Sequence, residues 1–281
     1  MKYLSALFLF LYCFSVYSQE KKDSISNWNI KGEVTFLFNQ SSFSNWTSGG
    51  EDAIASNINI NYDLNYKKGK INWDNKMITT YGLSYTTDDG YRKTNDNFEY
   101  NSLFGLKQST YWFFSFLLNF KTQYARGYDY EKSPKKTTSN FFSPAYLSLG
   151  PGMLWKKSDQ LRINLAPATT KITIVSDEFS GNYGVREGRN ISYDIGFNLS
   201  AYYKVKLMKN VNMENIIALY SNYLINPQNI DLDYRMNLVF VINKYITSNI
   251  TAHTIIDNNA SSKVQFNQQF GLGINYLFHE K

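Results

Sequence analysis

The side chains best suited to acid–base chemistry lie near the end of the chain. His253 is one of two histidines, and the other is His279. The charged residues around His253 in the sequence are Asp231, Asp233, Arg235 and Asp257. A histidine beside carboxylates can accept and donate protons near neutral pH. If the strands that carry these residues are neighbours, the group forms a candidate acid–base site.

Other kinds of catalytic site lack their usual sequence patterns. His253 and His279 have no metal-ligand partner at a useful spacing, and Cys13 is the single cysteine. No Gly-x-Ser-x-Gly turn and no phosphate-binding glycine loop occurs. The sequence therefore predicts no catalytic residues, no metal and no cofactor. A solvated residue on a polar face is the simpler interpretation of His253.

The first eighteen residues have the pattern of a secretory signal peptide. Lys2 supplies a positive start, an apolar run covers 3–17, and the small residue Ser18 precedes a polar stretch. A membrane anchor helix is the alternative, but a span needs about 20 apolar residues and this run is shorter. We predict cleavage after Ser18, so that the mature chain 19–281 contains no cysteine.

Beyond residue 18, apolar and polar residues alternate with a period of two. In the segment 54–66, Ile58 and Ile60 fall on one face, while Asn59 and Asn61 fall on the other. Segments 191–206 and 264–278 show the same alternation. Because successive side chains of a strand point to opposite faces, each segment predicts a strand with one apolar and one polar face.

These strands are too long, and their polar faces too charged, for a soluble barrel with an apolar interior. Ordinary strands have about 5–6 residues, whereas a tilted membrane strand needs about 9–11. An apolar outside and a polar inside are typical of a transmembrane barrel, whose closure also satisfies every backbone group in lipid. We predict an all-β fold, namely a transmembrane up-and-down antiparallel β-barrel over residues 19–281.

About twelve strands follow from counting the alternating segments. They cover 28–39, 54–66, 71–86, 97–107, 111–125, 143–155, 160–175, 191–206, 211–224, 230–242, 246–257 and 264–278. Short connections alternate with longer ones at 40–53, 87–96, 126–142 and 176–190, as expected for short periplasmic turns and longer outer loops. Gly150-Pro151-Gly152 and Pro167 predict bulges or bends in the segments that alternate least cleanly.

Aromatic residues gather toward the predicted strand ends. They are Trp28, Tyr62, Tyr66, Trp73, Tyr81, Tyr85, Tyr111, Trp112, Trp155, Tyr276 and Phe278. Rings at these positions predict the two girdles of a membrane barrel. The last strand also resembles the C-terminal signal of outer-membrane barrels at Gly273, Tyr276 and Phe278, which implies recognition by the barrel-assembly machinery.

The polar face carries charges of both signs, which we expect to face the lumen. The candidates are Lys31, Glu33, Asp63, Lys76, Lys121, Asp194, Lys204, Lys206, Glu214, Asp231, Asp233, Arg235, His253 and Asp257. They either brace the barrel as internal ion pairs or line a selective pore, and the mixed signs favour bracing. Lys204 and Lys206, for example, are expected to meet Glu214 across their hairpin.

Two stretches resemble a known family. They are 39–51, which reads NQSSFSNWTSGGE and precedes a Lys-Lys-Gly-Lys turn and Trp73-Asp74-Asn75, and 221–231, which reads SNYLINPQNID. Together they resemble an uncharacterised family of secreted Bacteroidota proteins that carry a domain of unknown function. The resemblance implies an outer-membrane barrel and no catalytic residues. Both stretches fall in predicted outer loops. The residues that could fold back into the mouth as a gate are Phe43, Trp46, Gly49, Gly50 and Glu51.

The sequence thus favours a non-enzymatic outer-membrane barrel, either a small passive pore or a structural or assembly component. An outer-membrane lipid-modifying enzyme, built around His253, is one alternative. A soluble periplasmic barrel carrier is another. The expected partners are outer-membrane lipid and the assembly machinery. Nucleic acid is not expected, because the basic residues are spread along the chain although the isoelectric point is near 9.0.

Overall fold

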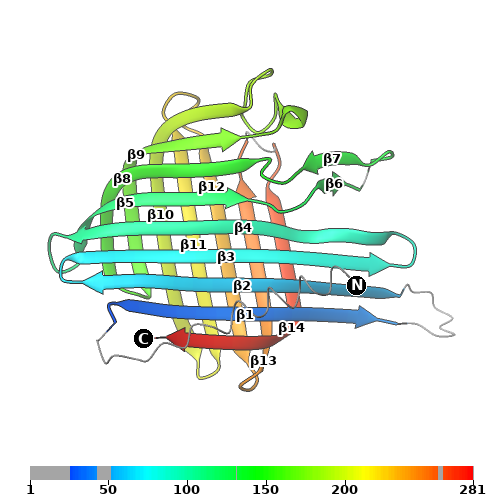
Figure 1. Ribbon diagram of the computed structural model, residues 1–281, viewed down its shortest axis with the longest axis horizontal. Coiled ribbons are helices and arrows are strands. Elements are labelled where there is room, and N and C mark those ends of the chain that lie inside the picture. The colour runs from blue at the N-terminus through cyan, green and yellow to red at the C-terminus, as the bar shows by residue number, and fades with distance from the viewer. Residues whose placement is uncertain (1–25, 43–51, 131, 259–261, 281) are drawn as a thin grey trace, which may run out of the picture.

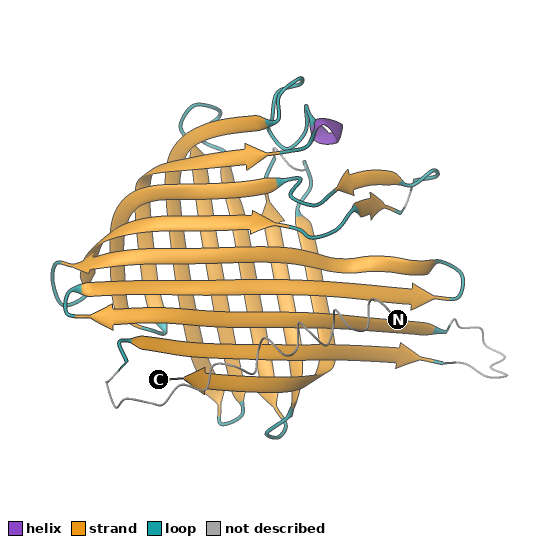
Figure 2. Ribbon diagram, viewed as in Figure 1, coloured by secondary structure: helices purple, strands orange, loops and turns teal. Residues whose placement is uncertain are grey.

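Twelve long antiparallel strands form a closed barrel in the computed structural model, which describes residues 26–42, 52–130, 132–258 and 262–280 (Figures 1 and 2). The barrel strands are β1 (Trp28–Ser41), β2 (Ala53–Lys68), β3 (Ile71–Thr86), β4 (Gly90–Lys107), β5 (Trp112–Thr122), β8 (Ala145–Ser158), β9 (Leu161–Ile174), β10 (Ile191–Met208), β11 (Val211–Asn222), β12 (Ile230–Val241), β13 (Ile246–Ile256) and β14 (Gln265–Glu280). Each pairs with its neighbours in the chain order of the barrel strands, and β14 returns to β1 to close the ring. The predicted fold class is therefore confirmed.

Each of the twelve predicted segments overlaps one barrel strand. Alternation with a period of two over more than ten residues is typical of a strand and of no other regular structure. One predicted connection was wrong. The loop expected at 87–96 is a tight turn, because β4 begins at Gly90, which takes a positive φ of 69°. Sequence reasoning also missed a small hairpin of β6 (Gly127–Asp129) and β7 (Lys136–Ser139), and the short 3₁₀ helix η2 (Asp177–Phe179). No helix in the described part of the chain is long and apolar enough to cross a membrane.

The two ends of the barrel differ in their connections. Short connections lie at one end, here called the turn end, at 69–70, 108–111, 159–160, 209–210 and 242–245. The described long connections, 123–144 and 175–190, lie at the other end, here called the loop end. The register of β1 with β2 and β14 puts the start of β1 and the end of β14 at the turn end. The predicted signal peptide 1–18 and the predicted gate residues within 43–51 lie outside the described residues.

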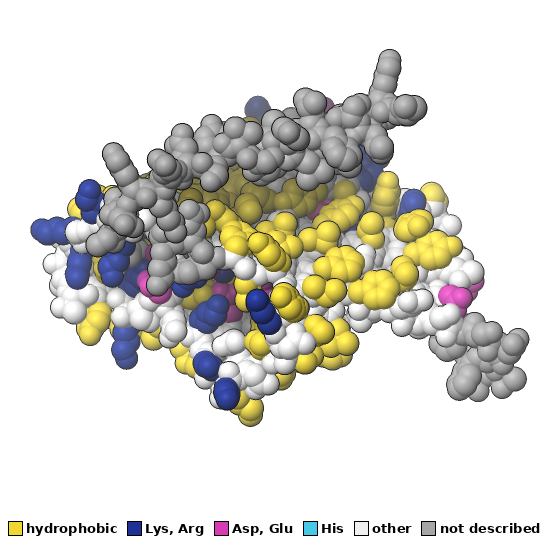
Figure 3. All heavy atoms as spheres, turned by 60° about the horizontal axis from the view of Figure 1, so that its bottom comes forward, with side chains coloured by type: hydrophobic (Ala, Val, Ile, Leu, Met, Phe, Trp, Pro, Cys, Tyr) yellow, Lys and Arg dark blue, Asp and Glu magenta, His cyan; other side chains and the backbone are white. Residues whose placement is uncertain are grey.

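Apolar side chains cover the outside of the barrel. On β1, Phe36 and Phe38 are 41% and 43% exposed, whereas Thr35 and Leu37, which alternate with them along the strand, are buried. The same alternation runs around the ring, and Figure 3 shows the resulting apolar surface on the side that it draws. At the turn end Trp28 stacks against Tyr66 and Trp73, with ring centroids 4.9 and 5.9 Å apart. An apolar outer band with aromatic ends and a polar interior is the arrangement of a transmembrane β-barrel.

A bulge on β9 interrupts the ladder near Pro167, as the proline predicted. The pairing of β8 with β9 shifts register between Leu149 and Met153, which brackets Gly150-Pro151-Gly152. The pairing of β9 with β10 shifts register between Thr169 and Ala166, which bracket Pro167. In both pairings the extra residue is on β9, so the alternation of inner and outer side chains changes phase on β9. β8 keeps its phase, because its register with β5 is unbroken across Gly150-Pro151-Gly152.

Two glycines shape the seam between β1 and β14. Gly32 lies opposite Phe278, and a Cβ on Gly32 would stand 1.8 Å from the Phe278 ring on the outer face. On the inner face, a Cβ on Gly273 would stand 2.8 Å from Thr35 and 2.9 Å from Leu37. Glycine at these positions therefore lets side chains of the opposite strand pack directly on the backbone.

Replacing Gly32 with Ala is expected to lower the free energy of unfolding by about 1–3 kcal/mol, because the new methyl group must push the Phe278 ring off the seam. Thermal unfolding in detergent, followed by tryptophan fluorescence, measures the loss. Gly271→Ala is the matched control on β14, since its Cβ would meet nothing closer than 3.6 Å. Equal losses in the two variants would contradict the packing explanation.

Candidate functional site: the lumen

Ion pairs connect opposite walls of the barrel. Lys76 Nζ on β3 lies 3.1 Å from Glu214 Oε1 on β11, and Arg235 Nη1 on β12 lies 3.0 Å from Glu99 Oε2 on β4. Each of these strand pairs is six positions apart in the ring of twelve. Side chains from facing walls therefore meet in the middle of the lumen. We call Lys76, Glu99, Lys121, Glu214, Asp233 and Arg235 the cross-lumen belt.

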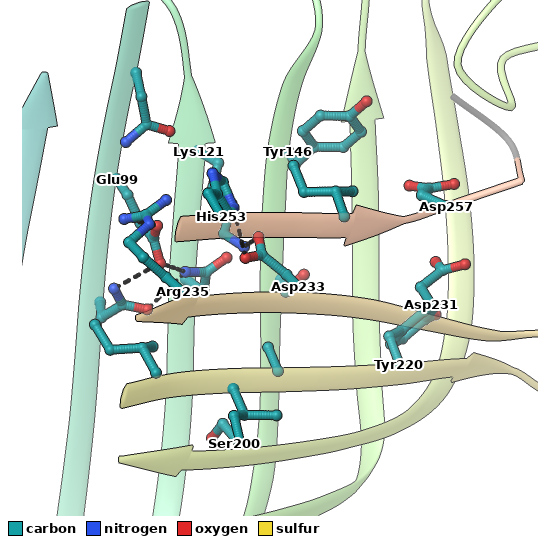
Figure 4. Close-up of a pocket in the computed structure, with 18 of the residues that line it drawn as sticks. Glu99, Lys121, Tyr146, Ser200, Tyr220, Asp231, Asp233, Arg235, His253 and Asp257 are labelled. Atoms are coloured by element: carbon teal, nitrogen blue, oxygen red, sulfur yellow. Dashed lines mark hydrogen bonds and ion pairs between the residues drawn. The ribbon is translucent and has the colours of Figure 1, made fainter. Parts of the chain in front are cut away.

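Asp233 joins the belt to His253. Lys121 Nζ lies 2.5 Å from Asp233 Oδ2, and His253 Nε2 lies 2.9 Å from Asp233 Oδ1, so the two carboxylate oxygens have separate partners (Figure 4). Among the described residues, no hydroxyl lies within hydrogen-bonding distance of His253. The carboxylate of such a pair orients the imidazole. His253 also lies on the inner face, away from lipid.

A second charged group lies toward the loop end. Lys171 Nζ on β9 is 3.0 Å from Asp231 Oδ2 and 3.4 Å from Asp257 Oδ2. The same ammonium lies over the rings of Tyr146 and Tyr220, 5.7 and 5.2 Å from their centroids. Lys171 is thus held by charge and by aromatic faces together, and it ties β9 to β12 and β13.

Near the turn end, one side of the lumen is filled. Leu103, Phe113, Leu117, Leu154 and Ala166 form a buried apolar cluster on β4, β5, β8 and β9. Beside this cluster, Lys156 Nζ bonds Asp74 Oδ2 at 2.7 Å and Asn72 Oδ1 at 3.0 Å. Lys156 also reaches Asp159 in the turn, at 2.9 Å. Burial opposes ionisation of Asp159, but the hydrogen bond and charge of Lys156 outweigh it and hold the pKa of that carboxyl below its usual value.

Two cavities lie inside the barrel and meet at the belt. The larger, of about 700 Å³, reaches the loop end at Thr138 and Tyr183. The smaller, of about 90 Å³, lies between the walls made by β1–β4 and β11–β14. Arg235 and His253 line both cavities. Nearly half of the residues that line the smaller cavity are amides, namely Asn59, Asn61, Asn95, Asn97, Asn237, Asn249, Asn267 and Gln269.

Several inward amides on this side have no protein partner. The unpaired buried oxygens include the Oδ1 atoms of Asn57, Asn237, Asn249 and Asn275. A buried polar atom left unsatisfied costs about 1–3 kcal/mol. The β1–β3 and β11–β14 side of the lumen therefore calls for water or a polar solute, whereas the apolar cluster fills the β4–β9 side near the turn end.

The structure places the sequence-derived candidates as follows. Lys76, Lys121, Asp231, Asp233, Arg235, His253 and Asp257 line the larger cavity, and Glu33 and Glu214 line the smaller one. Asp63 pairs with Lys76 at 3.4 Å, and Asp194 accepts a hydrogen bond from Asn222. Lys31, Lys204 and Lys206 are exposed at the turn end. Lys204 lies opposite Glu214 across the hairpin, as expected, but the ion pair of Glu214 is with Lys76 of the opposite wall.

Sequence reasoning missed Lys156 and Lys171, which anchor two of the charged groups. Lys171 lies on β9, where the bulge changes the phase of the alternation, and Lys156 lies on the adjacent strand β8. The available signal was the short run on the far side of the bulge, where Ile172 and Ile174 alternate with Lys171 and Thr173. No group of metal-ligand residues that could hold an ion occurs among the described residues.

Comparison with known proteins gives one partial family match. Residues 38–128 match a family described as "Protein of unknown function (DUF3078)". This range contains the first of the two family-like stretches, 39–51, but not the second, 221–231. No curated protein matches the chain in sequence.

Several solved outer-membrane barrels are similar in structure. The COG4313 outer membrane channel from Pseudomonas putida F1 has a TM-score of 0.41 at 8% identity, over 94% of this chain and 100% of that chain. The translocator domain of the autotransporter NalP from Neisseria meningitidis has a TM-score of 0.34 at 6% identity, over 97% and 94%. The outer membrane channel DcaP of Acinetobacter baumannii has a TM-score of 0.31 at 10% identity, over 89% and 96%.

Proposed function

We propose that this protein is a non-enzymatic integral outer-membrane barrel that lets small polar solutes pass through a narrow, hydrated route. The route runs from the larger cavity at the loop end, past Arg235 and His253, into the smaller cavity and out at the turn end. The observation that carries the proposal is that Arg235 of the cross-lumen belt and the neighbouring His253 line both cavities. The unpaired amides along the second cavity support it, because they require water or solute.

The outer surface and two sequence signals support an outer-membrane location. The exposed apolar band with aromatic ends suits a bilayer, and short turns in such barrels face the periplasm. Export requires the signal peptide proposed for residues 1–18. We also propose that the barrel-assembly machinery reads Gly273, Tyr276 and Phe278 on β14, the strand that closes the ring.

The inner position of His253 weighs against a lipid-modifying enzyme. A lipid substrate approaches from the outer face, whereas His253 and Asp233 point into the lumen (Figure 4). A soluble carrier would need polar residues outside, yet Phe266, Phe270 and Ile274 of β14 are each more than 60% exposed.

Purified protein in planar bilayers is expected to give discrete current steps, and liposomes that contain it are expected to take up small polar solutes. Asn249→Phe should reduce both signals severalfold, because the ring fills the cavity of about 90 Å³. Ile250→Phe is the matched control: it is the next residue of β13, and it lies opposite the outward Phe270. Silent bilayers with protein shown to be inserted would contradict the pore and leave a structural role.

A further inference from the structure

The turn end of the barrel is strongly cationic. Its connections and the strand ends beside them carry Lys67, Lys68, Lys70, Lys107, Lys156, Lys157, Lys206, Lys209 and Lys244. The carboxylates of the same described segments are Asp159, which pairs with Lys156, and Glu280 at the end of β14. Figure 3 shows Lys and Arg side chains gathered toward one end of the face that it draws. The described loop-end connections instead mix both signs, as in Arg126 with Glu178 and Lys132 with Asp129.

Five turn-end lysines belong to the inner face of the barrel. Residues directly opposite each other on paired strands share a face. Lys31 is opposite Asp63, which bonds the lumen residue Lys76, and Lys204 is opposite Glu214 of the belt. Lys206 follows Lys204 by two residues and so points the same way.

The other two follow by the same register. Lys67 is opposite Asn72, which bonds Lys156, and Lys107 is opposite Phe113 of the apolar cluster. The five lysines Lys31, Lys67, Lys107, Lys204 and Lys206, here called the mouth lysines, therefore surround the opening of the lumen. They come from β1, β2, β4 and β10, on both sides of that opening.

The mouth lysines have no ion-pair partner among the described residues, and all five are exposed. Deeper in the lumen, Lys76, Lys121, Lys171 and Arg235 are each paired with a carboxylate. These four cations are thus neutralised by ion pairs, whereas the mouth lysines at the turn-end opening are not. A ring of unpaired cations at a pore opening raises the local concentration of anions and repels cations.

We propose that the mouth lysines recruit small inorganic or carboxylate anions, so that the pore selects anions over cations. This inference rests on the proposed function and names the solute class of the same route. Lipid headgroups are a poorer match for these five lysines, because their positions belong to the inner face and the headgroups of the bilayer surround the outer one.

The test is the reversal potential of the protein in a planar bilayer under a gradient of KCl, repeated with potassium acetate. The reversal potential of the wild type is expected to have the sign of an anion-selective pore in both salts. Replacing Lys31, Lys204 and Lys206 together with Gln should shift the reversal potential toward zero. Replacing the same three with Arg should preserve the wild-type value, because the charge stays.

The matched control replaces three loop-end lysines, Lys132, Lys135 and Lys136, with Gln, and it is expected to leave the reversal potential unchanged. A conducting wild type without anion selectivity, or equal shifts in the two Gln triples, overturns the inference and leaves the pore. Inserted protein without any current overturns the pore, and the inference with it. The two failures are therefore distinguishable in one experiment.

Discussion

Lys76→Met is expected to lower the free energy of unfolding by about 3–5 kcal/mol, which is the cost of leaving buried charges without their partner. The Lys76 side chain is 7% exposed and bonds Glu214 at 3.1 Å and Asp63 at 3.4 Å. Tyr202 donates a further hydrogen bond of 2.6 Å to Glu214 Oε1 but brings no charge. Without the ammonium, two carboxylates face each other inside the barrel.

Thermal or urea unfolding in detergent measures this loss, and heat-modifiable migration on a gel gives a second readout. Lys132→Met is the control, because Lys132 is 59% exposed and lies 3.7 Å from Asp129 in a loop, where an ion pair contributes little. The triple variant K76M/D63N/E214Q should regain most of the stability, because it removes all three charges. If the triple variant is as unstable as Lys76→Met, lost packing rather than unpaired charge is the cause.

The fold could be predicted because one physical rule repeats around the ring. Lipid outside and water inside impose a period of two on each strand, and β10 follows it over 18 residues. The rule weakens where the backbone departs from it. The bulge near Pro167 changes the phase of β9, which hid Lys171. The turn at Gly90 was predicted as a loop because 87–96 is polar on both faces.

The partners within the lumen could be predicted only in part. A neighbour across a hairpin can be inferred from sequence spacing, which is why Lys204 was expected to pair with Glu214, and the two are opposite in register. The pairing of Lys76 with Glu214 joins residues 138 positions apart on facing walls. It depends on how closely the two walls approach, and alternation within single strands carries no information about that distance.

Removing the Arg235–Glu99 pair as a whole is expected to raise the single-channel conductance roughly twofold or more, because this pair crosses the route where the two cavities meet. The proposed variant is E99A/R235A. It deletes both charges, so neither is left alone in the lumen, and Asn101 and Asn119 lose only the carboxylate that they bond. The shortened side chains leave a gap between β4 and β12 that water can fill.

The control removes an ion pair that does not cross the lumen. Arg126 and Glu178 lie 3.5 Å apart in loops and are about half exposed, so R126Q/E178Q should conduct as the wild type does. Unfolding curves of both variants must be compared first, because a loosened barrel would also leak. If E99A/R235A folds normally and its conductance stays at the wild-type value, the solute route does not pass the belt. A rise confined to E99A/R235A instead assigns the narrowest point of the route to the contact between Arg235 and Glu99.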